Sequence, residues 1–264
     1  LDRSGYHATY DLLGEAVQDM DAVQSAAKEY LRLLEELAAR GLGRNVSLKP
    51  TQMGLSLSEN GCFDTVAQIA GHAQRLGAFL RFEMEDSSLV DSTLRVYARL
   101  RTAYPGVVGC VLQSMLRRTE EDACKLVAAG GPLNVRLVKG IYVEPPELAY
   151  QDADEVRESW KRTLRVLLEG GAFVAAATHD QDLAEAAVSA REERPEWRDR
   201  VEIQMLLGVR EEMRANLRDR GLPVRVYVPY GPDWYPYVLR RLRKNPKLAR
   251  YALLGLFSKR ESMD

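Results

Sequence analysis

Four side chains near the end of the chain share one face of a predicted helix. Tyr237, Arg240, Arg241 and Lys244 are three or four residues apart, which puts them on one surface of an α-helix. Two neighbouring guanidinium groups beside a phenol can hold a small carboxylate at two points. Basic residues in the last turns of helices also complement the helix dipole, and such residues usually stay solvated. The spacing therefore indicates an anion-binding face that the rest of the chain must support.

Polar or charged residues also follow, or occur within, most of the short apolar segments that we predict to be strands. Because strands of a parallel barrel end at one rim, where such folds carry their sites, these side chains would converge. Taken singly, a histidine or a lysine at a strand end is commonly structural, so the convergence carries the hypothesis. The candidates are Lys49, Glu83, Met84, Gln113, Arg136, Lys139, Gly140, Tyr142, Thr178, His179, Gln204 and Tyr227.

The segments that must position these residues alternate along the chain. Predicted strands cover residues 46–48, 79–83, 107–112, 135–138, 173–177, 201–206, 224–228 and 251–256. Predicted helices cover about 16–40, 63–76, 91–103, 120–129, 155–168, 183–193, 211–220 and 236–243. Strands joined by crossover helices form a parallel sheet, and eight such units favour a closed (βα)8 barrel of the α/β class, formed as one domain over residues 1–264. The hydrophilic stretch at 192–200 is predicted to be a longer loop.

Composition excludes several classes of function. The formal net charge is −1 with 28% charged residues, so no overall field favours nucleic acid. The three histidines and three cysteines lack the spacing of a metal site, and we expect no metal. The cysteines fit a reducing compartment. No apolar run reaches the ~18 residues of a spanning helix, so we expect a soluble protein.

Several motifs together resemble the proline dehydrogenase family. The most specific are Val-Arg-Leu-Val-Lys-Gly-Ile-Tyr at 135–142 and the Tyr-x-x-Arg-Arg helix at 237–241. The resemblance continues, in order and over nearly the whole chain, at 47–54, 111–114, 177–179 and 202–206. Several motifs at compatible spacing are far more specific than any one of them.

The resemblance implies a distorted (βα)8 barrel of the TIM type, with an N-terminal helix and a carboxylate-clamping helix over the C-terminal mouth. It implies FAD as the cofactor and oxidation of L-proline to Δ1-pyrroline-5-carboxylate by hydride transfer to flavin N5. It also implies that electrons pass to a quinone at a membrane surface, which fits a cytoplasmic protein peripheral at the inner membrane face. Family members act alone or as the corresponding domain of a bifunctional proline utilization protein, beside a pyrroline-5-carboxylate dehydrogenase.

The resemblance also implies roles for individual residues. Arg240 and Arg241 match the clamp for the proline carboxylate, with Lys49 adding positive charge. Arg136 matches the arginine beside flavin N5, and Lys49 and Glu83 would tune charge around the amine and carboxylate. The residues that match contacts to the proline ring are Tyr142, Leu206, Tyr227 and Tyr237. Those that match flavin contacts are Met84, Val111, Gln113, Arg136, Lys139, Gly140, Tyr142, Thr178, His179, Gln204 and Arg241.

The chain departs from the family pattern at four places. Glu83 stands where the family usually has Asp, Val143 where it usually has an aromatic residue, and Lys244 where it usually has Glu. A basic contact to the distal half of the cofactor is also missing around 150–153. We expect Glu83 and Val143 to be tolerated, whereas Lys244 reverses the charge at an expected flavin contact. The missing basic contact predicts that FAD binds less tightly or in another pose.

The sequence is compatible with two other functions. A Schiff-base aldolase could use Lys49 or Lys139 as its nucleophile, because a desolvated lysine among arginines can attack a carbonyl. A flavin-binding module without redox activity is the second alternative. Within the oxidoreductase interpretation, Tyr227 favours proline over hydroxyproline, because a phenol there would crowd a ring substituent.

Overall fold

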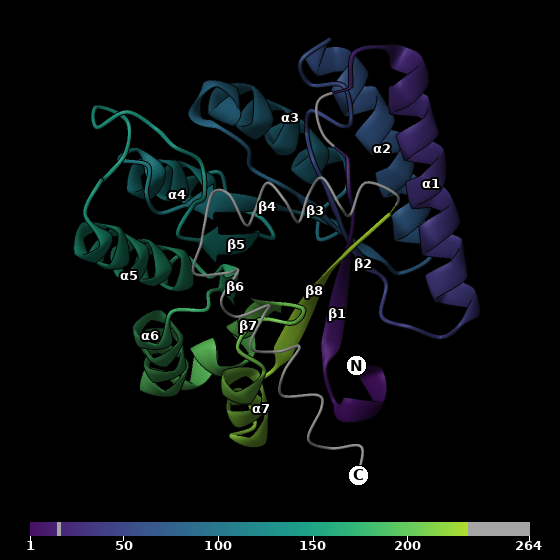
Figure 1. Cartoon of the computed structure of the whole chain (residues 1–264). Helices are drawn as coiled ribbons and strands as arrows, with labels where there is room; N and C mark the ends of the chain where they lie inside the picture. Colours follow the sequence, from purple (N-terminus) through teal and green to yellow (C-terminus); the bar gives the residue numbers. More distant parts are fainter. Residues whose placement is uncertain (15–16, 232–264) are drawn as a thin grey trace.

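Eight parallel strands close into a barrel that is surrounded by helices (Figure 1). The structure is a computed structural model, and it describes residues 1–14 and 17–231. Each strand pairs in parallel with its neighbours in the sequence, and the last strand pairs with the first. The strands are β1 His7–Leu12, β2 Asn45–Leu48, β3 Phe79–Phe82, β4 Val108–Gln113, β5 Asn134–Val138, β6 Phe173–Ala177, β7 Val201–Leu206 and β8 Val224–Tyr230. The predicted (βα)8 barrel is confirmed.

A helix follows each of the first seven strands and covers the outside of the barrel (Figure 1). The helices are α1 Met20–Ala39, α2 Glu59–Arg75, α3 Val90–Ala103, α4 Thr119–Ala128, α5 Ala153–Glu169, α6 Gln181–Glu193 and α7 Glu211–Asp219. Helix α1 corresponds to the helix predicted at about 16–40. It lies between β1 and β2 and so forms the first crossover connection. The predicted helix at 236–243 and the predicted strand at 251–256 lie outside the described residues.

The strand that completes the barrel was missed by the sequence analysis. Residues His7–Leu12 form β1, which pairs with β8 from His7–Arg225 through Leu12–Tyr230 and thereby closes the ring. The ring is thus closed by described residues alone, and the segment predicted at 251–256 lies outside them. Thr9 and Asp11 alternate with apolar residues on β1 and are fully buried. Buried polar side chains broke the apolar run by which the other strands were recognised.

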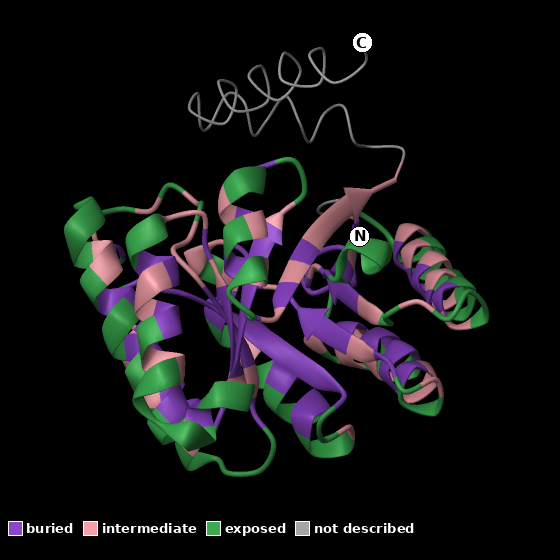
Figure 2. Cartoon of the chain, turned by 90° about the horizontal axis from the view of Figure 1, so that it is seen from below, coloured by how far each residue is buried: buried purple, intermediate pink, exposed green. Residues whose placement is uncertain are grey.

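The apolar core lies between the barrel and the helices. Val46, Leu80, Val135, Ile203 and Val226 stand on the outer faces of their strands and are fully buried. Figure 2 shows this buried layer running along the strands and the inward sides of the helices. The alternate residues point into the barrel, and an unusual share of them is polar. The barrel interior of this fold commonly holds bulky branched side chains.

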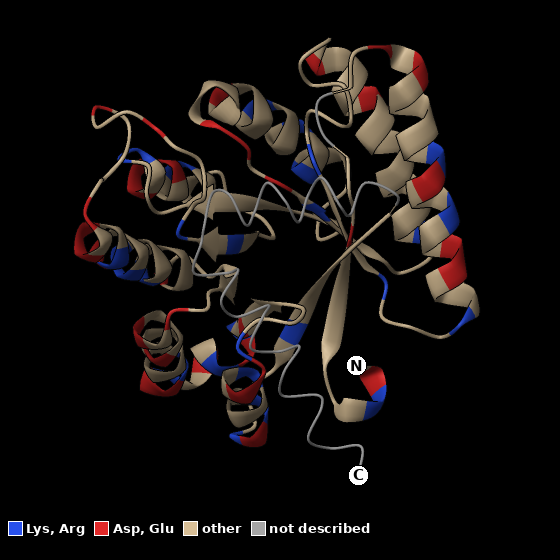
Figure 3. Ribbon diagram, viewed as in Figure 1, with Lys and Arg blue, Asp and Glu red and all other residues tan. Residues whose placement is uncertain are grey.

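The helices form where apolar residues recur at helical spacing behind a capping side chain. In α1, Val23, Tyr30 and Leu34 face the core, and the Asp19 carboxylate accepts a hydrogen bond from the Ala22 amide at 2.9 Å. In α5, Trp160 is fully buried and its indole nitrogen donates to the Leu137 carbonyl of β5 at 3.3 Å. Acidic and basic residues are mixed along the outer helices (Figure 3).

The loop predicted at 192–200 is partly helical. A 3-10 helix covers Pro195–Arg200, with proline in its first turn. Trp197 is only 2% exposed and packs into the main core, with the Arg194 guanidinium 4.6 Å from its ring centre. The hydrophilic composition therefore concealed a short ordered segment that is anchored by one aromatic side chain.

No helix in the described part of the chain combines the length and the apolar character that crossing a bilayer requires.

Trp160→Ala should lower the free energy of unfolding by about 3–5 kcal/mol, because it leaves a cavity where α5 packs on β5. Urea denaturation followed by circular dichroism measures the change. The neighbouring exposed Lys161→Ala is the matched control and should shift stability by no more than about 0.5 kcal/mol. Equal effects of the two substitutions would show that this contact does not stabilise the barrel.

Candidate active site

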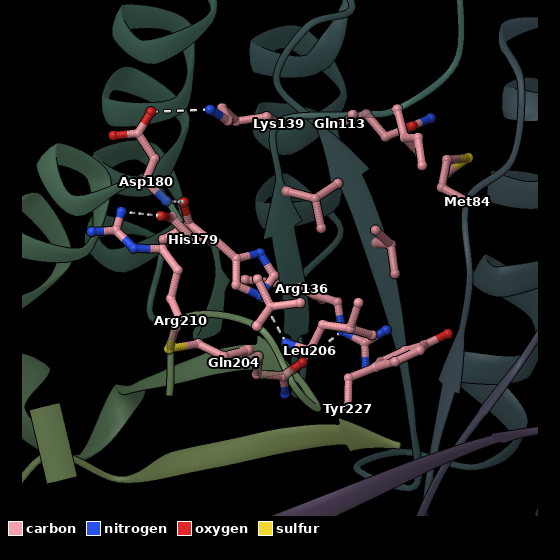
Figure 4. A pocket seen from close by; sticks show the side chains of 18 of the residues that line it. Met84, Gln113, Arg136, Lys139, His179, Asp180, Gln204, Leu206, Arg210 and Tyr227 are labelled. Atoms are coloured by element: carbon pink, nitrogen blue, oxygen red, sulfur yellow. Dashed lines mark hydrogen bonds and ion pairs between the residues drawn. The ribbon is translucent and has the colours of Figure 1, made fainter. Parts of the chain in front are cut away.

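A cavity of about 710 Å³ opens at the carboxyl ends of the strands (Figure 4). Its walls come from β4 through β8, from the loop after β3 and other loops at this end of the barrel, and from α5 and α6. Most of the predicted site residues within the described part of the chain line it: Glu83, Met84, Val111, Gln113, Arg136, Lys139, Gly140, Thr178, His179, Gln204, Leu206 and Tyr227. The structure thus brings together side chains from five strands and from the loop after β3, as expected for the active rim of this fold.

Arg136 is the centre of the cavity floor. It points inward from β5, and its side chain is only 4% exposed. Its Nη1 donates to the Glu83 carboxylate, its Nε to Gln204 Oε1 at 2.6 Å, and its Nη2 to Ser47 Oγ at 3.0 Å. The guanidinium also lies 5.1 Å from the centre of the Tyr227 ring. Three directional contacts and one ring fix the cation in a single orientation.

The hydrogen-bond network continues downward inside the barrel. The Gln204 amide donates to the Glu202 carboxylate at 2.5 Å. The Arg225 guanidinium donates two further hydrogen bonds to that carboxylate, at 2.9 and 3.1 Å. Burial raises the pKa of Glu202, but the Arg225 guanidinium and the Gln204 amide outweigh it and hold that pKa below its usual value. A carboxylate that stays charged here keeps Gln204 oriented, so that its amide oxygen faces Arg136.

A second cationic cluster lies at the cavity wall around Asp180. This carboxylate caps α6 by accepting from the Asp182 amide at 3.1 Å. Its other oxygen binds Lys139 Nζ at 3.0 Å and Arg157 Nε at 2.9 Å. Burial raises the pKa of Asp180, and the two cations outweigh that effect and lower it.

Arg210 adds a further guanidinium to the cavity wall near the Asp180 cluster (Figure 4). It is the non-glycine residue with positive φ, 48°, in the described ranges 1–14 and 17–231. Its Nη1 donates to the His179 carbonyl at 2.8 Å. Together with the amino end of α6, these cations make one side of the cavity suited to an anion.

His179 is fixed in one protonation pattern by the backbone. The Leu206 amide donates to His179 Nε2 at 2.9 Å. A backbone N–H is always a donor, so Nε2 must carry a lone pair, and the proton of the neutral ring must be on Nδ1. His179 therefore ties the end of β7, including Leu206, to the loop after β6.

Gly140 is required by backbone conformation and by packing. Its φ is 108°, a value that L side chains rarely adopt. A Cβ atom at this position would lie 2.4 Å from the sulfur of Met115. Backbone conformation and packing against Met115 thus require glycine after Lys139, apart from any contact with a ligand.

Two predicted site residues lie away from the described cavity lining. Lys49 is held by the Gly14 carbonyl at 3.3 Å and lies 3.7 Å from the buried Asp11 carboxylate. Tyr142 packs beside the apolar cluster that includes Met84 and Val111, and both of those residues line the cavity. The predicted clamp residues Tyr237, Arg240 and Arg241 and the atypical Lys244 lie outside the described residues.

A family model described as "Proline dehydrogenase" matches residues 1–250. The chain belongs to the proline dehydrogenase family.

Curated relatives agree with this assignment over nearly the whole chain. Proline dehydrogenase 2 of Bacillus subtilis is 32% identical over 259 residues, which cover 98% of this chain and 84% of that protein. Proline dehydrogenase of Deinococcus radiodurans is 33% identical over 260 residues, which cover 97% of this chain and 83% of that protein. Both matches therefore extend over nearly all of this chain and over most of each relative.

A solved structure supports the fold in detail. Proline utilization A (PutA) from Bdellovibrio bacteriovorus, inactivated by N-propargylglycine, superposes with a TM-score of 0.83 and 25% identity. The match covers 91% of this chain but only 30% of that chain. This proline dehydrogenase barrel thus spans about a third of the length of that PutA.

Several polar residues that the barrel brings to the site were not predicted from the sequence. Asp11, Ser47 and Glu202 are buried within strands and contact predicted site residues. Arg157 and Arg210 come from α5 and from the start of α7, beyond the strand ends that were searched. A basic group therefore faces the cavity although 150–153 lacks one. Alternation of polar residues along the strands could have indicated the first set, but no local signal marked the two arginines.

Glu83→Ala should destabilise this proline dehydrogenase by about 3–5 kcal/mol, because it leaves the buried Arg136 without its carboxylate partner. Glu83→Asp keeps the charge and should cost clearly less. Chemical denaturation of both variants at pH 7 measures the difference. If both substitutions cost the same, the carboxylate does not compensate the buried guanidinium.

Proposed function

We propose that this chain oxidises L-proline to Δ1-pyrroline-5-carboxylate with FAD bound in the barrel cavity. An oxidoreductase that acts on proline is what membership of the family indicates. The observation that carries the proposal is the buried Arg136, which Glu83, Gln204 and Ser47 hold at the cavity floor. We further propose that residues 1–264 form one barrel domain, since the family match extends to residue 250.

The described residues fit FAD in size and in charge. A cavity of about 710 Å³ lies within the ~300–1,000 Å³ usual for cofactor sites. One side carries Lys139, Arg157, Arg210 and the amino end of α6, which suit a diphosphate. The other side carries Arg136 and Gln204, which suit the polar edge of a flavin ring. FAD, when bound, supplies the acceptor for the hydride that leaves the carbon next to the proline nitrogen, and the amine proton would pass to water or to a nearby base.

The chain's own residues would position the reactants and stabilise charge. Arg136 is a fixed cation where negative charge develops on the acceptor, and this arrangement needs no reorganisation during the reaction. Gln113, Thr178 and His179 offer further polar contacts along the cavity wall. The remaining proposed cofactor contacts are Met84, Val111, Lys139, Gly140, Tyr142, Gln204 and Arg241.

We propose that proline binds between the cavity floor and the predicted clamp. Tyr227 and Leu206 line the cavity and would supply apolar contacts to the ring. Arg240 and Arg241 would hold the carboxylate, with Lys49 adding positive charge and Tyr142 and Tyr237 closing the site. Glu83 would tune charge beside the amine. Holding reactants in this way is expected to provide most of the rate, because no covalent nucleophile is needed.

We propose a quinone as the final electron acceptor and a cytoplasmic location with peripheral contact at the inner membrane face. The product would pass to a pyrroline-5-carboxylate dehydrogenase. The likeness to one part of PutA is compatible with either a separate partner or a longer chain, because the barrel matches only 30% of that protein.

The aldolase alternative has less support. Both lysines that it would use lie beside carboxylates, Lys49 3.7 Å from Asp11 and Lys139 3.0 Å from Asp180. Schiff-base formation needs a neutral amine in a desolvated site. A side chain held in an ion pair is a poor starting point for that chemistry.

Purified protein supplied with FAD should show flavin absorbance that bleaches when L-proline is added without oxygen. An anaerobic visible spectrum before and after proline measures this directly. Bound flavin that proline never bleaches would favour the redox-silent module. Trapping of substrate on lysine by borohydride, without flavin binding, would favour the aldolase.

Arg240→Ala and Arg241→Ala should each raise KM for proline by about tenfold or more, because a charge-assisted hydrogen bond to the carboxylate is worth about 1.5–3 kcal/mol. Steady-state kinetics with an artificial electron acceptor gives KM and kcat separately. Arg191→Ala removes an exposed guanidinium on α6 that donates to the Arg198 carbonyl at 2.7 Å, and it serves as the control. An unchanged KM in both clamp variants would reject the assignment.

A further inference from the structure

Asp11 is a buried carboxylate that the proposed reaction has not so far used. It lies at the end of β1, paired in register with Ser47 of β2 and Pro229 of β8. Its side chain is completely buried. Lys49 Nζ lies 3.7 Å from its Oδ2, which is longer than the ~2.7–2.9 Å of a charge-assisted hydrogen bond. The two groups therefore form a loose ion pair just behind the cavity.

Cavity residues surround this pair. Glu83, Arg136 and Tyr227 line the cavity, and all three influence the pKa of the Asp11 carboxyl. Tyr30 of α1 and Tyr230 of β8 also face its charge from the outer side. Any change in the Asp11 charge is thus felt by groups that would contact the substrate.

Asp11 differs from the other buried carboxylate of the barrel interior. Glu202 has two close bonds from Arg225 and one from Gln204, and its pKa is lowered. Burial raises the pKa of Asp11 to about 6, and Lys49, Tyr227 and Arg136 only partly offset this effect. Glu202 therefore stays charged at neutral pH, whereas the raised pKa of Asp11 lets it take up a proton near pH 6.

We propose that Asp11 is a positioning residue for proline binding, which holds the Lys49 ammonium in place beside the substrate cavity. This inference rests on the proposed function. A protonated Asp11 removes the negative charge that lies 3.7 Å from the Lys49 ammonium, which weakens the hold on that cation. Proline affinity should then fall as pH drops through the range in which Asp11 takes up a proton.

The pH dependence of kcat/KM for proline tests this inference in the FAD-loaded enzyme. Between pH 5 and 7, proline is a zwitterion, and the loss of its amine proton affects the wild type and the variants alike, so a difference in slope between them reports on the protein. Below about pH 6, wild-type kcat/KM should fall up to about tenfold more per pH unit than that of Asp11→Asn, mainly through a rise in KM. Asp11→Asn should be about tenfold or more lower at pH 8 and should lack this additional acid limb, since it resembles the protonated form.

Two further variants separate positioning from general damage. Asp11→Glu retains a charge and should retain an acid limb. Asp122→Asn replaces another buried aspartate, which pairs with Arg118 at 2.7 Å on α4, and should keep the wild-type profile. Flavin absorbance of each variant reports whether the barrel is intact. An Asp11→Asn enzyme with wild-type kcat/KM, or with the same acid limb, overturns the inference.

A readout without catalysis distinguishes this inference from the proposed function. The carboxyl ¹³C signal of Asp11 should titrate near pH 6 in the wild type and higher in Lys49→Met, because the neighbouring cation is lost. Protein that proline never reduces would reject the proposed function. An Asp11 titration that Lys49→Met leaves unchanged would reject the inference, whatever the activity.

Discussion

One buried cation constrains the whole interior of this barrel. A guanidinium cannot be taken out of water unless its charge and its donors are matched, because an isolated buried charge costs several kcal/mol. Arg136 is therefore surrounded by a carboxylate, an amide oxygen and a hydroxyl, which come from the end of β3, from β7 and from β2. These partners in turn need orientation. Glu202 orients Gln204 by accepting a hydrogen bond from its amide, and Arg225 in turn holds Glu202. Positive and negative side chains therefore alternate from the barrel interior up to the cavity.

This constraint explains what could be predicted from sequence and what could not. Seven strands and seven helices were recognised because their outer faces pack against each other and so repeat apolar residues at regular spacing. Residues such as Lys139, His179 and Tyr227 were found because they follow or end those strands. β1 was missed because its inner face carries Thr9 and Asp11, which serve the polar interior and interrupt the apolar pattern. Arg157 was missed because only the folded chain places α5 beside Asp180.

Asp180 shows how the fold and the site depend on the same atoms. One oxygen ends the strand-to-helix turn by capping α6, and the other gathers Lys139 and Arg157 at the cavity wall. Capping fixes the carboxylate before any ligand is bound, so the two cations are arranged in advance. His179 works similarly, because one ring nitrogen accepts from the Leu206 amide while the residue lines the cavity. Local backbone requirements thus set the geometry of side chains that have no sequence motif linking them.

The same strand pair closes the barrel and brings residues of the site together. β1 pairs with β8 in a register that sets Thr9 opposite Tyr227 and Asp11 opposite Pro229. The strand pair that closes the ring therefore brings Asp11 near Tyr227 and Lys49, and it completes the wall around Arg136. A barrel without β1 would lose the partner of β8, and the cavity would lose the charge that faces Lys49. The first strand is consequently polar on its inner face, because its side chains serve the cavity as well as the sheet. For the same reason it lacks the apolar periodicity by which the other strands are recognised.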